Sequence, residues 1–198
     1  MSNSATPSMP GSLLDRFLAR LLDGVLLAVV VWGIVATLFT SILIGGGLGY
    51  GSGAYFVLGT LVALAGLAIN FGYYIFLETR QGQTLGKMVM KLRVQGPDGQ
   101  HPTVGQSLRR NAFMAVGVVG TVAGDILGVI PVVGGFLGGL VSALIGLAGL
   151  ALVIYIAYTI NEDSTARQGW HDKFAGGTRV LKEQPEAVSS PPVTPPAT

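Results

Sequence analysis

The sequence contains no cysteine, which excludes disulfide bonds, thiolate metal sites and cysteine nucleophiles. It also has little charge. Only 11% of its 198 residues are Asp, Glu, Lys or Arg, whereas a soluble domain carries roughly 25%. Half of the residues are hydrophobic. A surface this apolar is unfavourable in water but favourable in contact with lipid, so the composition favours an integral membrane protein.

Two long stretches contain almost no charge. Residues 24–77 have none, and residues 111–161 have only Asp125. A membrane-spanning helix needs roughly 20 apolar residues, so each stretch has room for two spans and a turn. Glycine and proline clusters at 45–53 and 131–135 divide the two stretches. The sequence therefore predicts an all-α four-transmembrane-helix bundle. The predicted spans lie near residues 17–44, 54–77, 109–130 and 136–160.

The basic residues predict the orientation, because Lys and Arg are excluded from short translocated loops. All twelve lie near the start of the first predicted span, around the connection between spans two and three, or after span four. We therefore expect both termini in the cytoplasm. Residues 1–14 have no Lys or Arg, so a cleaved signal peptide is not expected. The basic segments suit anionic lipid headgroups, so the expected partner is the lipid bilayer and not nucleic acid.

Three domain segments are expected: a disordered N-terminus at 1–11, a membrane domain at 12–182 and a Pro-rich disordered tail at 183–198. The connection between spans two and three should form a small cytoplasmic interfacial layer. Four apolar residues there have the i, i+3, i+4, i+7 spacing of an interfacial helix. They are Leu85, Met88, Val89 and Leu92.

Two short strands are also expected in this layer. Residues 90–94 alternate in character, and we expect them to pair with a second strand near 177–181. Thr103 and Gln106 have the spacing of a capping box, which predicts that the helix of the third span begins there.

Asp23 is the most informative polar residue, because an Asp at the centre of a membrane helix costs roughly 2.5–3.5 kcal/mol. Arg16 and Arg20 lie on the same helical face. Asp23 either forms a salt bridge that eases helix insertion or binds a cation or proton in a polar cavity. Asn70 and Tyr155 lie at a similar depth, roughly 9–12 Å from the cytoplasmic ends of their spans. They are therefore candidates for a shared polar cluster.

Asp125 and His171 are secondary candidates. Asp125 marks the outer end of a route from Asp23, or simply reaches the outer interface. His171 has no other His, Cys or carboxylate at metal-ligand spacing except its neighbour Asp172. We therefore expect no metal and no cofactor. No nucleophile–base pair is visible either, so we do not expect an enzyme.

Small residues repeat every four positions in the last predicted span, a pattern that lets helices approach closely. It predicts packing within the bundle or a homo-oligomer face. The two stripes are Gly134, Gly138, Ser142 and Gly135, Gly139, Ala143.

Three motifs together resemble the RDD family of bacterial membrane proteins, named for one arginine and two aspartates. The first, RFLARLLD, contains Arg16, Ala19 and Asp23. The second, GQTLGK, begins at residue 82 and precedes Leu-Arg-Val at 92–94. The third, RQGWHDKFAGGT, has one glycine more than the family pattern and contains Asp172.

The resemblance implies a multi-pass protein of the bacterial plasma (inner) membrane, with a role suggested in transport. It also implies shared importance for Arg16, Asp23 and Asp172. We therefore expect the segment around Asp172 to fold back onto the inner face and to pair with Arg16 or Arg20. Two functions fit. One is a small cation- or proton-linked transporter, or transporter subunit, that uses Asp23. The alternative is a non-transporting scaffold or accessory subunit that recruits a cytoplasmic partner.

Overall fold

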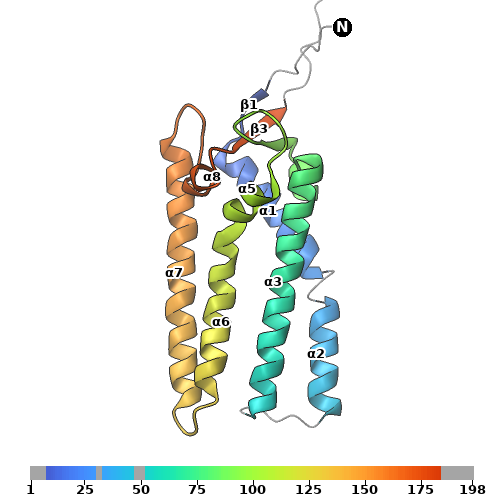
Figure 1. The fold of residues 1–198 in the computed structure, drawn as a ribbon, viewed down its shortest axis with the longest axis vertical. Helices are drawn as coiled ribbons and strands as arrows, with labels where there is room; N and C mark the ends of the chain where they lie inside the picture. Colours follow the sequence, from blue (N-terminus) through green and yellow to red (C-terminus); the bar gives the residue numbers. More distant parts are fainter. Residues whose placement is uncertain (1–7, 30–32, 47–51, 184–198) are drawn as a thin grey trace, which may run out of the picture.

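The computed structural model describes residues 8–29, 33–46 and 52–183. Three of the described helices are long and apolar enough to cross a membrane. The first is α3 (Gly53–Gln81) and the last is α7 (Gly134–Glu162). The second is continuous over Val104–Gly128 and consists of α5 (Val104–Asn111), the 3-10 turn η2 (Ala112–Met114) and α6 (Ala115–Gly128). They lie side by side (Figure 1) and confirm a mostly helical protein. Only 6% of the apolar windows of α3 and α7 is buried, as expected for helices that face lipid.

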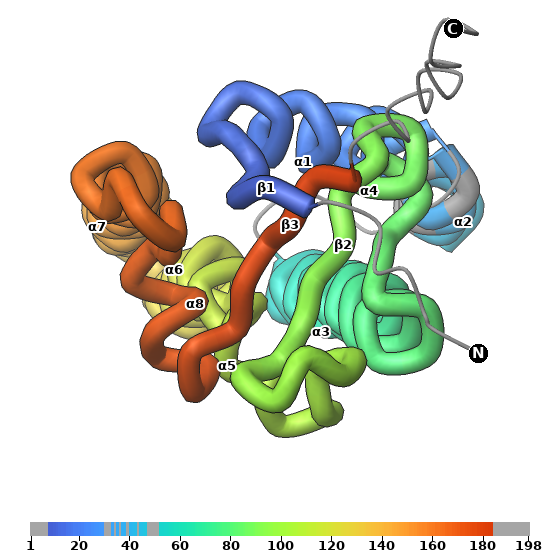
Figure 2. The backbone as a smooth tube through the Cα atoms, turned by 90° about the horizontal axis from the view of Figure 1, so that it is seen from above, coloured from blue at the N-terminus to red at the C-terminus, as the bar shows by residue number. Residues whose placement is uncertain are grey.

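Where the sequence predicts one span over 17–44, the structure describes two helices, α1 (Leu13–Leu27) and α2 (Gly33–Gly45), and residues 30–32 lie outside the described part. α2 has 13 residues, which is too short to cross roughly 30 Å of hydrocarbon alone. α1 runs obliquely to the other helices (Figures 1 and 2), and its buried side, with Ala19 and Asp23, packs against Gly86 in the short helix Leu85–Val89. The predicted outer loop at 45–53 falls partly on residues 47–51, which also lie outside the described part.

A three-stranded antiparallel sheet lies across one end of the bundle, which we call the sheet end. Its order is β1 (Ser8–Pro10), β3 (Arg179–Glu183), β2 (Leu92–Gln95), and Val94 is opposite Val180. The predicted strand pair is confirmed, and β1 is an addition.

β1 corrects the prediction that residues 1–11 are disordered. Ser8–Pro10 pair with the free edge of β3, because an open strand edge offers unpaired backbone groups. Residues 1–7 lie outside the described part. Glu183, placed in the disordered tail by the sequence, ends β3, and residues 184–198 also lie outside it.

The small core of the sheet end is formed by Ala19, Leu92, Val94 and Val180, all fully buried. α4 (Leu85–Val89) packs against α1 and confirms that a short helix forms here. It buries Gly86 and Lys87 and leaves its apolar side chains exposed, which suits a helix at a lipid surface. α8 (Trp170–Phe174) folds back beside α5 and α7. The predicted capping box at Thr103 opens α5.

One of the two small-residue stripes packs inside the bundle. A side chain on Gly138 would collide with the backbone of Gly124 on α6, and the Ser142 hydroxyl donates to the carbonyl of Gly120 at 2.9 Å. Gly139, in the other stripe, has open space around it. Close backbone approach therefore joins α6 and α7 on one face only.

We expect Gly138→Leu to lower the thermal stability of the protein in detergent, because overpacking costs roughly 1–3 kcal/mol or more. Gly139→Leu is the matched control and should leave the melting temperature unchanged. An equal loss in both variants would contradict this packing. A change of oligomeric state in Gly139→Leu alone, measured by size exclusion with light scattering, would identify a homo-oligomer face.

Candidate functional site

The sheet end buries three carboxylates completely: Asp23 from α1, Glu78 from α3 and Asp172 from α8. A buried charge is costly unless it is paired and hydrogen-bonded. Each carboxylate here has donors from other elements of the chain. The resulting network connects α1, α3, α4, α5 and α8.

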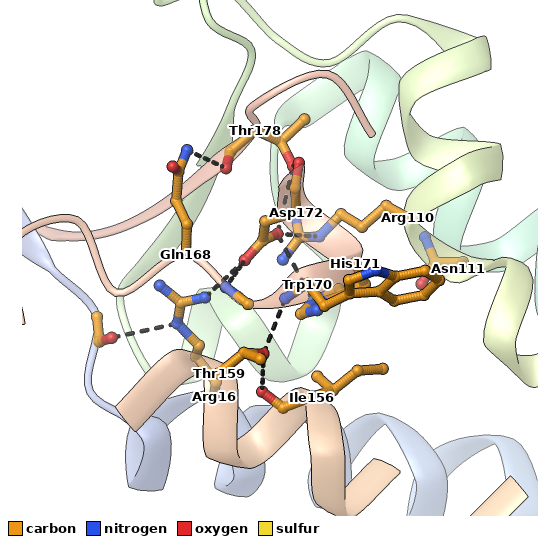
Figure 3. Close-up of polar contacts among 12 residues, drawn as sticks. Arg16, Arg110, Asn111, Ile156, Thr159, Gln168, Trp170, His171, Asp172 and Thr178 are labelled. Carbon is orange, nitrogen blue, oxygen red and sulfur yellow. Dashed lines mark hydrogen bonds and ion pairs between the residues drawn. The ribbon is translucent and has the colours of Figure 1, made fainter. Parts of the chain in front are cut away.

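Asp172 lies between two arginines (Figure 3). Arg16 Nη1 is 2.9 Å from Oδ2, and Arg110 Nε is 3.0 Å from Oδ1. The Gly169 amide donates to Oδ2 at 3.2 Å and the Thr178 hydroxyl to Oδ1 at 3.3 Å. The predicted pairing with Arg16 is confirmed, and Arg110 is a second partner that the sequence did not reveal. Burial alone would raise the pKa of Asp172, but Arg110 and Arg16 lower it to about 2.

Glu78 is the functional residue that sequence reasoning missed. It forms an ion pair with Lys87, accepts from Ser107 at 3.2 Å and from Asn111 at 3.3 Å, and has Arg110 Nη1 at 3.9 Å. Glu78 directly follows the charge-free stretch and so resembles an ordinary interfacial charge. The signal that points to it is Lys87 in the second motif, because a buried lysine needs an acid. Burial lowers the pKa of Lys87, opposed by Glu78, to about 8.

Asp23 accepts three hydrogen bonds: from the Tyr73 hydroxyl at 2.6 Å, the Thr84 hydroxyl at 2.6 Å and the Gly86 amide at 2.7 Å. Of the two alternatives for Asp23, the salt bridge to Arg16 or Arg20 does not form, because these donors already satisfy the carboxylate. Glycine is required at position 86, since an added Cβ would overlap the carbonyl oxygen of Ala19 and lie 2.9 Å from Asp23.

Arg20 points elsewhere. Its Nη1 donates to Asn111 at 3.1 Å, and its guanidinium lies 3.9 Å from the ring centroid of Tyr74. A cation above an aromatic face is attracted to the ring electrons. Arg20 therefore ties α1 to α3 and α5 without contacting a carboxylate.

The predicted polar cluster of Asp23, Asn70 and Tyr155 does not form. Asn70 donates to the carbonyl of Gly66 within its own helix at 2.8 Å, and Tyr155 is 49% exposed on α7. Depth along a helix does not set which way a side chain faces, and neither of these two has a hydrogen bond to Asp23. Asp125 accepts from Thr60 at 2.8 Å and so joins α6 to α3.

His171 is buried beside Phe113, with ring centroids 6.0 Å apart. Its Nε2 is 3.6 Å from Asp172, and Nδ1 has no hydrogen-bond partner among the described residues. Burial lowers the pKa of His171 to about 4 despite the nearby Asp172 carboxylate. The ring is therefore neutral at pH 7.

A family model described as "RDD family" matches residues 10–176 of the chain. No curated protein and no solved structure matches the chain. Within the described ranges, no group of three or more His, Cys, Asp or Glu side chains has an arrangement that holds a metal ion.

We expect Asp172→Asn to destabilise the protein by roughly 3–5 kcal/mol, because two buried arginines lose their anion. The matched control is Asp163→Asn. Asp163 pairs with the exposed Lys173 at 3.6 Å, and surface pairs contribute only about 0–1 kcal/mol. Thermal unfolding of the two purified variants measures the difference. Equal stability of both variants would contradict the role given to Asp172.

Stability should fall as the pH drops from about 6.5 to about 4. In this window His171 takes up a proton in the unfolded chain, whereas in the folded protein burial keeps the imidazole neutral. The loss is at most about 3 kcal/mol, from about 1.4 kcal/mol for each pH unit in this window. His171→Gln should flatten that part of the pH–stability curve. His101→Gln, at an exposed position, should leave it unchanged. A curve of the same steepness in His171→Gln would contradict this assignment.

Proposed function

The chain belongs to the RDD family, and we propose that it is a multi-pass membrane protein that serves as a non-transporting scaffold or accessory subunit. The observation that carries this proposal is that its buried carboxylates are occupied by the chain itself. Asp23 takes three donors, and Glu78 and Asp172 are each paired with cations. A transported cation needs acceptor oxygens that are free to receive it.

We place the sheet end in the cytoplasm of a bacterial cell, at the plasma membrane. The positive-inside rule supports this orientation, because the four basic side chains of the buried network, Arg16, Arg20, Lys87 and Arg110, all lie at the sheet end.

Four crossings are also part of the proposal. α3 begins at the end of the bundle far from the sheet (Figure 1), and α3, α5–α6 and α7 cross in alternating directions. β1 pairs with β3 at the sheet end. The chain between β1 and α3 therefore has to cross once more, and α1 and α2 together supply that crossing.

The second candidate function is proton or cation transport through Asp23. The observation that favours it is the 2.6 Å contact between the Asp23 carboxylate and the Tyr73 hydroxyl. A carboxylate hydrogen-bonded to hydroxyl groups on membrane helices is a typical proton or cation site.

Proteoliposome flux separates the two functions. With proton and sodium gradients, we expect flux through the native protein to equal that of empty vesicles. Asp23→Asn should lower the melting temperature without changing flux. The matched control is Asp125→Asn, at a carboxylate on α6 that accepts a hydrogen bond from Thr60. Flux in the native protein that is abolished by Asp23→Asn but retained in Asp125→Asn, at equal melting temperature, would favour transport.

An accessory subunit should also hold a partner. Chemical cross-linking in native membranes should give a stoichiometric hetero-complex with the full chain. Deleting residues 184–198, or neutralising exposed basic residues such as Arg109, should weaken it. A chain that cross-links only to itself would point to a homo-oligomer instead.

A further inference from the structure

A cavity of about 540 Å³ lies between α1, α7 and the sheet end. This size is within the roughly 300–1,000 Å³ of ordinary ligand pockets. One part of its lining is apolar and the other is cationic. Val25, Ala28, Val153 and Ala157 form an apolar part between the helices. The end beneath the sheet is lined by four cations, Arg16, Arg20, Lys87 and Arg110.

The charge that faces the cavity is of one sign. Among the described residues that line it there is no Asp or Glu. Glu78 and Asp172 contact Lys87, Arg110 and Arg16 but lie outside the lining. The four lining cations also outnumber the three buried carboxylates of the sheet end. The cavity therefore has an excess of positive charge.

Three of the residues that line the cavity each have a buried nitrogen atom with no hydrogen-bond partner within the described part of the chain: Arg16 Nη2, Arg110 Nη1 and His171 Nδ1. The side chains of Arg16 and Arg110 are only 9% and 6% exposed. A buried donor without an acceptor costs free energy. Arg16 Nη2 therefore has hydrogen-bonding capacity to spare, and Arg110 Nη1 has only the Glu78 carboxylate, at 3.9 Å. Figure 3 shows both guanidinium groups pointing toward Asp172 from opposite sides.

The apolar part of the cavity is not sealed. Val25 and Val153 are 55% and 48% exposed, and Phe17 and Leu21 on α1 are 60% and 50% exposed. The order of the two parts matches the bilayer, with cations at the sheet end and apolar walls between the helices. A ligand with an anionic head and a hydrocarbon chain fits both parts at once.

We propose that this cavity binds one anionic phospholipid, with its phosphate at Arg16 and Arg110 and an acyl chain between α1 and α7. Guanidinium groups bind phosphate oxygens through paired, charge-assisted hydrogen bonds. Basic pockets between membrane helices on the cytoplasmic side are suited to lipid headgroups. The proposal goes beyond the scaffold function and holds whether or not the protein transports.

The test uses the full chain purified in detergent. The probes are phosphatidylglycerol, phosphatidylcholine with the same acyl chains, and inorganic phosphate. Native mass spectrometry gives the retained lipid, and a thermal shift titration gives the apparent affinity. We expect phosphatidylglycerol to bind at a stoichiometry of one and to raise the melting temperature, with phosphatidylcholine and inorganic phosphate having little effect.

Two variants test the two parts of the cavity. Arg16→Lys keeps a charge beside Asp172 but removes the unpartnered Nη2, so phosphatidylglycerol should bind roughly tenfold more weakly. Gly24→Leu fills the apolar part, since Gly24 lines the cavity and has open space around it. The control is Gly72→Leu, an exposed glycine on α3 with open space and no place in the lining.

Loss of phosphatidylglycerol binding in Arg16→Lys and Gly24→Leu, with native binding in Gly72→Leu, would support the proposal. Three results would overturn it: equal binding of the two lipids, an equal thermal shift with inorganic phosphate, or native affinity in both cavity variants. If Arg16→Lys fails to fold, Gly24→Leu against Gly72→Leu still decides the question.

Discussion

The need to pair buried charge dominates the structure of the sheet end. Arg110 lies between two carboxylates, 3.0 Å from Asp172 and 3.9 Å from Glu78. Because these acids come from α8 and α3, one guanidinium group on α5 fixes three elements. Lys87 adds α4 through Glu78, and Arg16 adds α1 through Asp172. Removing any member leaves an uncompensated buried charge, which is far more costly than losing a surface ion pair.

The rest of the molecule is held together differently. In lipid there is no hydrophobic driving force between helices, so close packing and hydrogen bonds must bring them together. The glycine contact between α6 and α7 and the bond from Thr60 to Asp125 supply both. The protein thus has a bundle joined by close contact and a polar layer joined by ion pairs, with Asp23 linking α1 to that layer through α3 and α4.

The two signs of charge in the polar layer have different roles. Each buried acid is satisfied by the chain itself, which is why we favour a scaffold over a cation carrier. Arg16 and Arg110 each have one buried nitrogen without a hydrogen-bond partner among the described residues, and both residues line the cavity. Arg16 and Arg110, which hold α8 to α1 and α5 through Asp172, are therefore also the residues that we propose to bind an anionic lipid.

The sequence by itself determined the features that arise within a few residues. Charge-free stretches gave the long helices, apolar spacing gave α4, a capping box gave the start of α5, and alternation gave β2. The family motifs also predicted that Asp172 pairs with Arg16 or Arg20, and in the structure it pairs with Arg16. Only the tertiary structure decided which acid meets which base. Glu78, the partners of Asp23 and the exposed position of Tyr155 all depend on how helices turn against one another. That rotation is set by contacts between residues distant in the chain, which no local pattern records.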